Sequence, residues 1–135
     1  MNVNMQVLVV DDFSTTRRII SKLLRQVGIE HIYEARDGQE ALDVLDEVNI
    51  DLVVTDWHMP IMDGLELVVT MREQQDISHI PVLMVTAESK KEQMTLAAQA
   101  GVNGYIVKPF DATTLQTKIL RIADRLAMDH LLPTG

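Results

Sequence analysis

The 135-residue chain has no cysteine, which excludes disulfide bonds and thiol catalysis and is compatible with a reducing cytoplasm. Basic residues are few, because twelve Lys and Arg stand against twenty Asp and Glu, and the net charge is -8. Such a surface lacks the basic footprint that nucleic acid phosphates require, so nucleic acid is not an expected partner. Long apolar runs are also missing, so we expect neither a signal peptide nor a membrane span. These absences favour a cytoplasmic protein.

Short apolar runs of strand length alternate with amphipathic segments of helix length. Strands are predicted at residues 6–10, 31–35, 52–56, 82–86 and 105–107, and a helix is predicted after each. This alternation is typical of an α/β fold with a doubly wound, five-stranded parallel sheet and five helices. We expect a single domain over residues 1–128 and a tail over residues 129–135.

Three details of the helices can be predicted from local patterns. Ser14 is expected to cap the first helix and Asp111 the last one. The apolar stripe of the first helix should contain Ile19, Ile20, Leu23, Leu24 and Val27. The fourth helix, at residues 90–100, has few large apolar side chains and should pack loosely.

Chemically active side chains stand where the predicted strands end. Asp11 and Asp12 follow the first strand, Asp56 ends the third, Thr86 ends the fourth and Lys108 follows the fifth. The carboxyl ends of parallel strands open onto one crevice, so these groups should converge there. Converging carboxylates repel one another, and a hard cation such as Mg2+ relieves that repulsion. Lys108 and Thr86 could then hold phosphate oxygens, which leaves Asp56 as a nucleophile for phosphoryl transfer.

Motifs at residues 11–15, 56–60, 62–64, 85–88 and 104–110 resemble those of response-regulator receiver domains, above all the single-domain chemotaxis regulators. The resemblance extends over about residues 5–126. It implies the flavodoxin-like strand order 2-1-3-4-5. It also implies that Asp56 takes a phosphoryl group from a phosphohistidine of a chemotaxis-type sensor histidine kinase. The chain would then be a phosphoryl acceptor with self-catalysed phosphorylation and dephosphorylation.

The resemblance also assigns roles to individual residues. Asp12 and Asp56 would contact Mg2+ directly, Asp11 would act through water, and the main-chain carbonyl of His58 would be a further ligand. Lys108 and Thr86 would bind phosphoryl oxygens, and the peptide bond between Lys108 and Pro109 would be cis. The remaining roles are a switch made of Thr86 and Tyr105, and tuning of the lifetime of the phosphorylated state by His58, where relatives commonly have asparagine, and by Glu88.

The expected output is the binding of a flagellar motor switch protein by a monomer, and a dedicated phosphatase is a further expected partner. The predicted partner surface comprises Ser89, Lys90, Lys91, Met94, Ala98, Tyr105, Val107 and Lys118. The alternative for Lys90 and Lys91 is that they are ordinary solvated residues at the start of a helix and bind no partner.

Three other functions remain to be weighed. The same receiver chemistry would serve a phosphate sink or a shuttle to a target other than the motor. A magnesium-dependent phosphatase of the haloacid dehalogenase type needs a second acid two residues after its nucleophile, where this chain has His58. A flavodoxin-like redox protein needs a phosphate-binding loop after the first strand, where Asp11 and Asp12 would repel the flavin phosphate.

Overall fold

The computed structural model describes residues 4–131 and has the expected α/β architecture. A parallel sheet has the strand order β2-β1-β3-β4-β5, as the resemblance implied. The strands are β1 (Gln6–Val10), β2 (His31–Ala35), β3 (Leu52–Thr55), β4 (Val82–Thr86) and β5 (Gly104–Val107). The helices are α1 (Ser14–Gln26), α2 (Gly38–Glu47), α3 (Gly64–Glu73), α4 (Lys91–Ala100) and α5 (Ala112–Leu131).

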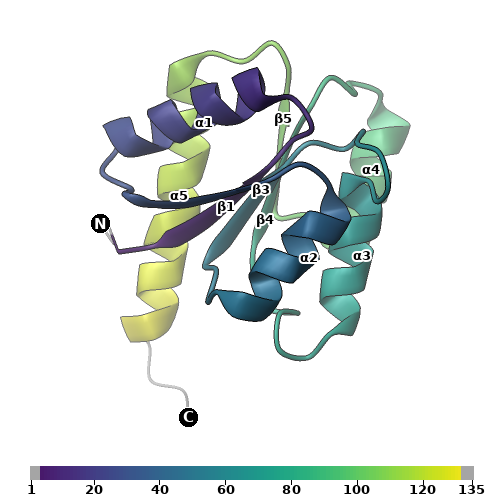
Figure 1. Cartoon of the computed structure of the whole chain (residues 1–135). Coiled ribbons are helices and arrows are strands. Elements are labelled where there is room, and N and C mark those ends of the chain that lie inside the picture. Colours follow the sequence, from purple (N-terminus) through teal and green to yellow (C-terminus); the bar gives the residue numbers. More distant parts are fainter. Residues whose placement is uncertain (1–3, 132–135) are drawn as a thin grey trace.

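Helices cover both faces of the sheet, α1 and α5 on one face and α2, α3 and α4 on the other (Figure 1). Each face therefore has its own apolar core. The first core includes Val9 of β1, Leu24 of α1 and Ile119 of α5. The second packs α2 and α3 against Leu8 of β1 and Val53 of β3. Adjacent residues of one strand point to opposite faces, which is why Leu8 and Val9 belong to different cores. The central strands are accordingly apolar and buried along their whole length.

The N-terminus of α1 differs from the sequence prediction. Phe13, and not Ser14, occupies the N-cap position, and its side chain makes no capping hydrogen bond. The Asp11 carboxylate instead accepts the Phe13 N–H at 2.9 Å and turns the chain into the helix one residue early. Ile19, expected in the buried stripe, is 49% exposed, whereas Ile20 and Leu24 are buried.

The prediction of a loosely packed α4 is confirmed. Ala97 is its only buried residue, and Lys90 at its N-cap makes no side-chain hydrogen bond. Its C-terminal end is held more firmly. Gly101 adopts a left-handed φ of 105°, and its carbonyl accepts hydrogen bonds from the Arg72 guanidinium of α3.

Arg72 fixes the end of the molecule opposite the carboxyl edge. Its five N–H groups donate to the carbonyls of Ser78, Ile80 and Gly101 and to the Asn103 side chain, at 2.7–3.3 Å. All its donor capacity is therefore used on neutral acceptors. Desolvation by burial lowers the pKa of Arg72 from its ordinary value.

The predicted cap of α5 is confirmed, because the Asp111 carboxylate accepts the Thr114 N–H at 2.7 Å. The helix continues to Leu131, past the start of the expected tail. Residues 132–135 lie outside the described residues, so the division into domain and tail stays a prediction. Within residues 4–131, we find no helix long and apolar enough to cross a membrane.

Candidate functional site

Three carboxylates meet at the carboxyl edge of the sheet. Val10 of β1 pairs with Thr55 of β3, so the residues that follow these strands lie side by side. Asp11, Asp12 and Asp56 each place a ligand atom within 4.8 Å of the others. The buried Oδ1 of Asp12 has no hydrogen-bond partner in the part of the chain that the structure describes. An unpartnered buried carboxylate oxygen among converging acids suits a hard divalent cation, so these residues fit the expected Mg2+.

Lys108 follows β5 at the same edge of the sheet and bridges two of the three acids. Its Nζ lies 2.9 Å from Asp56 Oδ2 and 3.1 Å from Asp11 Oδ2. The Lys108 N–H donates to the Thr86 carbonyl at 2.8 Å, and the peptide bond to Pro109 is cis, as expected. The ammonium therefore stands next to the oxygen atoms at which a phosphoryl group would be received.

Burial and charge act against each other at this site. Burial would lower the pKa of Lys108, but its hydrogen bonds and attraction to Asp56 and Asp11 outweigh burial and raise that pKa. Burial raises the pKa of Asp11, which is 1% exposed, although the Phe13 N–H and Lys108 work in the opposite direction. Ionisation of Asp11 therefore costs free energy in the isolated protein, and a cation bound here would offset that cost.

The loop after β3 holds Asp56 in a fixed position. Asp56 Oδ1 accepts the Trp57 N–H at 2.6 Å, so both carboxylate oxygens have partners. The Gly64 N–H donates to the Trp57 carbonyl, and a Cβ on Gly64 would collide with the Asp56 carbonyl. Asp63 then starts α3 with a reciprocal capping box to Glu66. Glycine is required because the loop and the start of α3 approach so closely.

The two predicted switch residues meet at Glu88, and neither makes a hydrogen bond to Asp56. Thr86 is buried, and its Oγ1 accepts the Glu88 N–H at 3.3 Å. The Tyr105 hydroxyl donates to the Glu88 carbonyl at 2.8 Å. Half-buried Tyr105 also packs against the cluster of Trp57, Met84 and Ala97. Burial, followed by the charges of Glu88 and Asp56, raises the pKa of Tyr105, so its hydroxyl keeps its proton.

A contact that sequence reasoning missed joins two loops at the mouth of the site. His58 Nε2 lies 2.7 Å from Glu88 Oε1, although the two residues are 30 positions apart in the chain. The His58 ring also stacks on Trp57, with ring centroids 5.9 Å apart and an interplanar angle of 19°. The resemblance had given His58 and Glu88 a role in tuning the phosphorylated state, but no sequence pattern indicated that their side chains meet.

The predicted partner surface lies on α4, β5 and α5. Tyr105, Val107 and Lys118 are half-buried, and the other members are exposed, namely Ser89, Lys90, Lys91, Met94 and Ala98. The structure therefore brings these residues to the surface. Their role in binding stays a prediction.

The fold and the cluster of acids with Lys108 define the class of protein. A family model described as the response regulator receiver domain matches residues 7–120, and the chain belongs to this family. Chemotaxis protein CheY-3 of Vibrio cholerae serotype O1 is 54% identical over 126 residues, which cover 93% of this chain and 97% of that protein. Chemotaxis protein CheY of Pseudomonas aeruginosa is 53% identical over 122 residues, with 90% and 98% covered.

Solved structures agree with this assignment. Chemotaxis response regulator CheY4 of Vibrio cholerae has a TM-score of 0.82 and 34% identity, and the match covers 88% of this chain and 98% of that one. The chain is thus a CheY-like receiver domain of two-component signalling.

Proposed function

We propose that this chain is a stand-alone response regulator that is phosphorylated on Asp56 in the presence of Mg2+ and controls flagellar motor switching. The observation that carries the proposal is the bridge from Lys108 Nζ to Asp56 Oδ2 and Asp11 Oδ2, beside the unpartnered oxygen of Asp12. A solvated surface lysine is not held between two acids at the end of a buried sheet, as Lys108 is. A phosphoryl acceptor needs this arrangement, because incoming negative charge requires a fixed cation.

The chemistry requires one bond to form and one to break. A carboxylate oxygen of Asp56 attacks the phosphorus of a phosphohistidine, and the electron pair of the broken P–N bond stays on the imidazole nitrogen. Lys108 then moves from the carboxylate to a phosphoryl oxygen, and the Thr86 hydroxyl donates to another. Asp11, Asp12, Asp56 and the His58 carbonyl would hold Mg2+, which when bound neutralises charge on the transferred group.

The Glu88 contacts support a switch between two arrangements. When Thr86 turns its hydroxyl toward a phosphoryl oxygen, its hydrogen bond to the Glu88 N–H is lost. The Glu88 carbonyl then shifts, and the bond from the Tyr105 hydroxyl weakens. Phosphate is thereby linked to the surface of α4, β5 and α5. His58 and Glu88 tune the lifetime of the phosphate, since their side chains meet at the mouth of the site.

The proposed donor is a chemotaxis-type sensor histidine kinase, and the proposed target is a flagellar motor switch protein. The chemotaxis names of the two curated relatives, both more than half identical to this chain, support these partners. We further propose a cytoplasmic monomer that binds neither nucleic acid nor membrane and is served by a dedicated phosphatase. The alternative is a phosphate sink or shuttle that shares the chemistry and serves a target other than the motor.

Phosphorylation of the wild type and of Asp56→Asn with acetyl phosphate and Mg2+ tests the acceptor. Mass spectrometry should find one phosphoryl group on the wild type and none on the variant, because the amide removes the nucleophilic oxygen. Equal labelling of both proteins would refute the assignment. Binding to a purified motor switch protein, with and without beryllofluoride as a phosphoryl mimic, then separates a motor regulator from a phosphate sink.

A further inference from the structure

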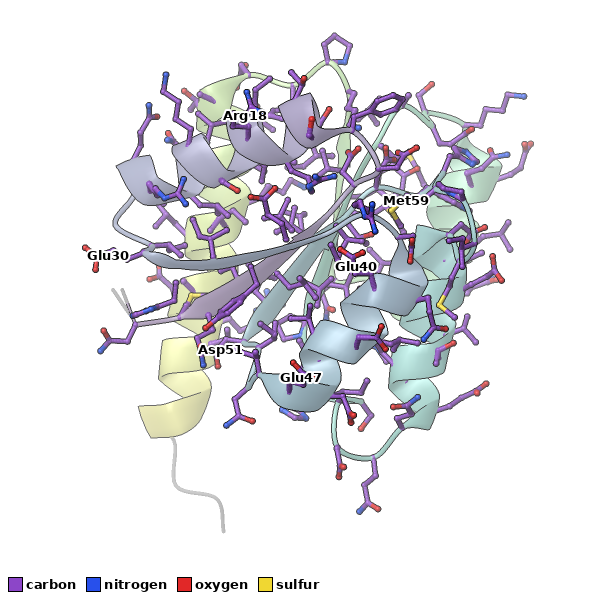
Figure 2. The ribbon with its side chains drawn as sticks, viewed as in Figure 1. Arg18, Glu30, Glu40, Glu47, Asp51 and Met59 are labelled. Atoms are coloured by element: carbon purple, nitrogen blue, oxygen red, sulfur yellow. The ribbon has the colours of Figure 1, made fainter. Side chains whose placement is uncertain are left out.

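Two large apolar side chains near the proposed phosphorylation site are exposed. Phe13 is 65% exposed and Ile61 is 82% exposed. They lie on the loops that follow β1 and β3, neighbouring strands whose ends carry the acid cluster. Met59, in the same loop as Ile61, lies at the end of the sheet opposite Asp51 (Figure 2). Phe13 and Ile61 therefore lie at the carboxyl edge of the sheet, one on the loop after β1 and the other on the loop after β3.

Ile61 is unfavourable for the local backbone. Its φ is 70°, which makes it the only described non-glycine residue with a positive φ. The Met62 N–H donates to the Pro60 carbonyl at 2.8 Å, so Ile61 is the central residue of a tight γ-turn. A β-branched side chain is poorly suited to this conformation. Because the Ile61 side chain is exposed, its burial does not offset the cost in free energy. Asparagine or glycine would serve the turn better.

Phe13 is similarly unfavourable for its position. It occupies the N-cap of α1, where Ser, Thr, Asp or Asn would accept a hydrogen bond from the first turn. The phenyl ring makes no such bond, and most of it faces solvent. Two residues that weaken local structure and are exposed beside the same site point to a role outside folding.

We infer that Phe13 and Ile61 form an apolar contact surface for the protein that donates the phosphoryl group. A donor must bring its phosphohistidine to bonding distance of Asp56, so its surrounding surface must meet the loops that carry these two residues. The chain has a net charge of -8 and three acids at the site, and the incoming group is itself an anion. The acids of this chain therefore repel the phosphoryl group, whereas burial of apolar surface favours contact regardless of charge.

This inference rests on the proposed function, and two donors separate the two ideas. Acetyl phosphate needs no docking surface, whereas a phosphorylated histidine phosphotransfer domain of a chemotaxis-type kinase does. The test variants are Ile61→Asn and Phe13→Ser, and Ile61→Leu is the variant that keeps apolar character. Val69→Asn is the matched control, because Val69 is also exposed, at 42%, but lies on α3.

With the protein donor below saturation, we expect transfer to Ile61→Asn and Phe13→Ser to slow about tenfold, equivalent to about 1.4 kcal/mol. Ile61→Leu and Val69→Asn should keep the wild-type rate. With acetyl phosphate, all five proteins should be labelled at the same rate. The melting temperatures of Ile61→Asn and Phe13→Ser should equal or exceed that of the wild type, because each substitution suits its backbone position better.

Three outcomes would overturn the inference. Unchanged transfer from the protein donor would show that these side chains contact nothing in the productive complex. Equal slowing with both donors would mean that they shape the site and do not dock a partner. If acetyl phosphate failed to label even the wild type, the proposed function would fall, and the docking surface with it.

Discussion

Asp12→Asn should stabilise the protein without Mg2+ and remove most of the stabilisation that Mg2+ provides. The ligand atoms of Asp12 and its two acidic neighbours lie within 4.8 Å of one another. At that separation, each pair of charges repels by about 3.5 kcal/mol at an effective dielectric constant of about 20. The positive charge of Lys108 offsets part of this repulsion, so we expect a net gain of about 1–2 kcal/mol in the free energy of unfolding.

Magnesium should reverse the order of stability. A ligand at hundredfold excess over its dissociation constant adds about 2.7 kcal/mol to the wild type, which exceeds the gain of about 1–2 kcal/mol expected for Asp12→Asn, and that variant lacks a direct ligand. Urea unfolding with and without Mg2+ measures both effects. Asp43→Asn is the control, since it makes the same change in net charge at an exposed position of α2. If Mg2+ stabilised Asp12→Asn as much as the wild type, the assignment of Asp12 as a metal ligand would be wrong.

Three further predictions concern Arg72, Lys108 and Thr86. Arg72→Met should lower the free energy of unfolding in urea by about 3–4 kcal/mol, because charge-assisted bonds to four acceptors are lost; a loss below about 1 kcal/mol would contradict this. The pKa of Lys108 is raised above its ordinary 10.5, so its contribution to stability is present below that value and is lost as pH rises through the folded-state pKa. Lys108→Met should therefore flatten the alkaline decline in stability, and an unchanged pH profile would count against the ion pairs. Thr86→Ala should accept phosphate normally but bind its target about 10- to 100-fold more weakly, because one hydrogen bond to a charged oxygen is missing; equal binding of the two phosphorylated proteins would exclude this coupling.

The strands and the acid cluster were predictable because burial and topology decide them. Residues 6–10, 31–35 and 82–86 form strands with the predicted bounds. The first and third are short apolar runs, whereas residues 31–35 are more polar and form the edge strand β2. Parallel pairing then carries the residues after β1, β3 and β5 to one edge. Asp56, Asp11 and Lys108 could thus be placed together without knowledge of any side-chain angle.

What could not be predicted depends on contacts between loops. Ser14 has a better capping side chain than Phe13, but the Asp11 carboxylate turns the chain earlier and overrides that preference. No sequence pattern indicates a positive φ at Ile61, because a β-branched residue is the last choice for that conformation. These failures of local rules lie beside the site, where structure is determined by function as well as by stability.

Glu88 connects the chemistry to the predicted output surface through two kinds of contact. Its backbone N–H and carbonyl meet Thr86 and Tyr105, whereas its side chain meets His58. A change in the Glu88 side chain therefore removes the His58 contact directly and leaves the backbone bonds available to the switch. If Asp56 is phosphorylated as proposed, substitutions of Glu88 should therefore alter the lifetime of the phosphate without removing the backbone bonds of the switch.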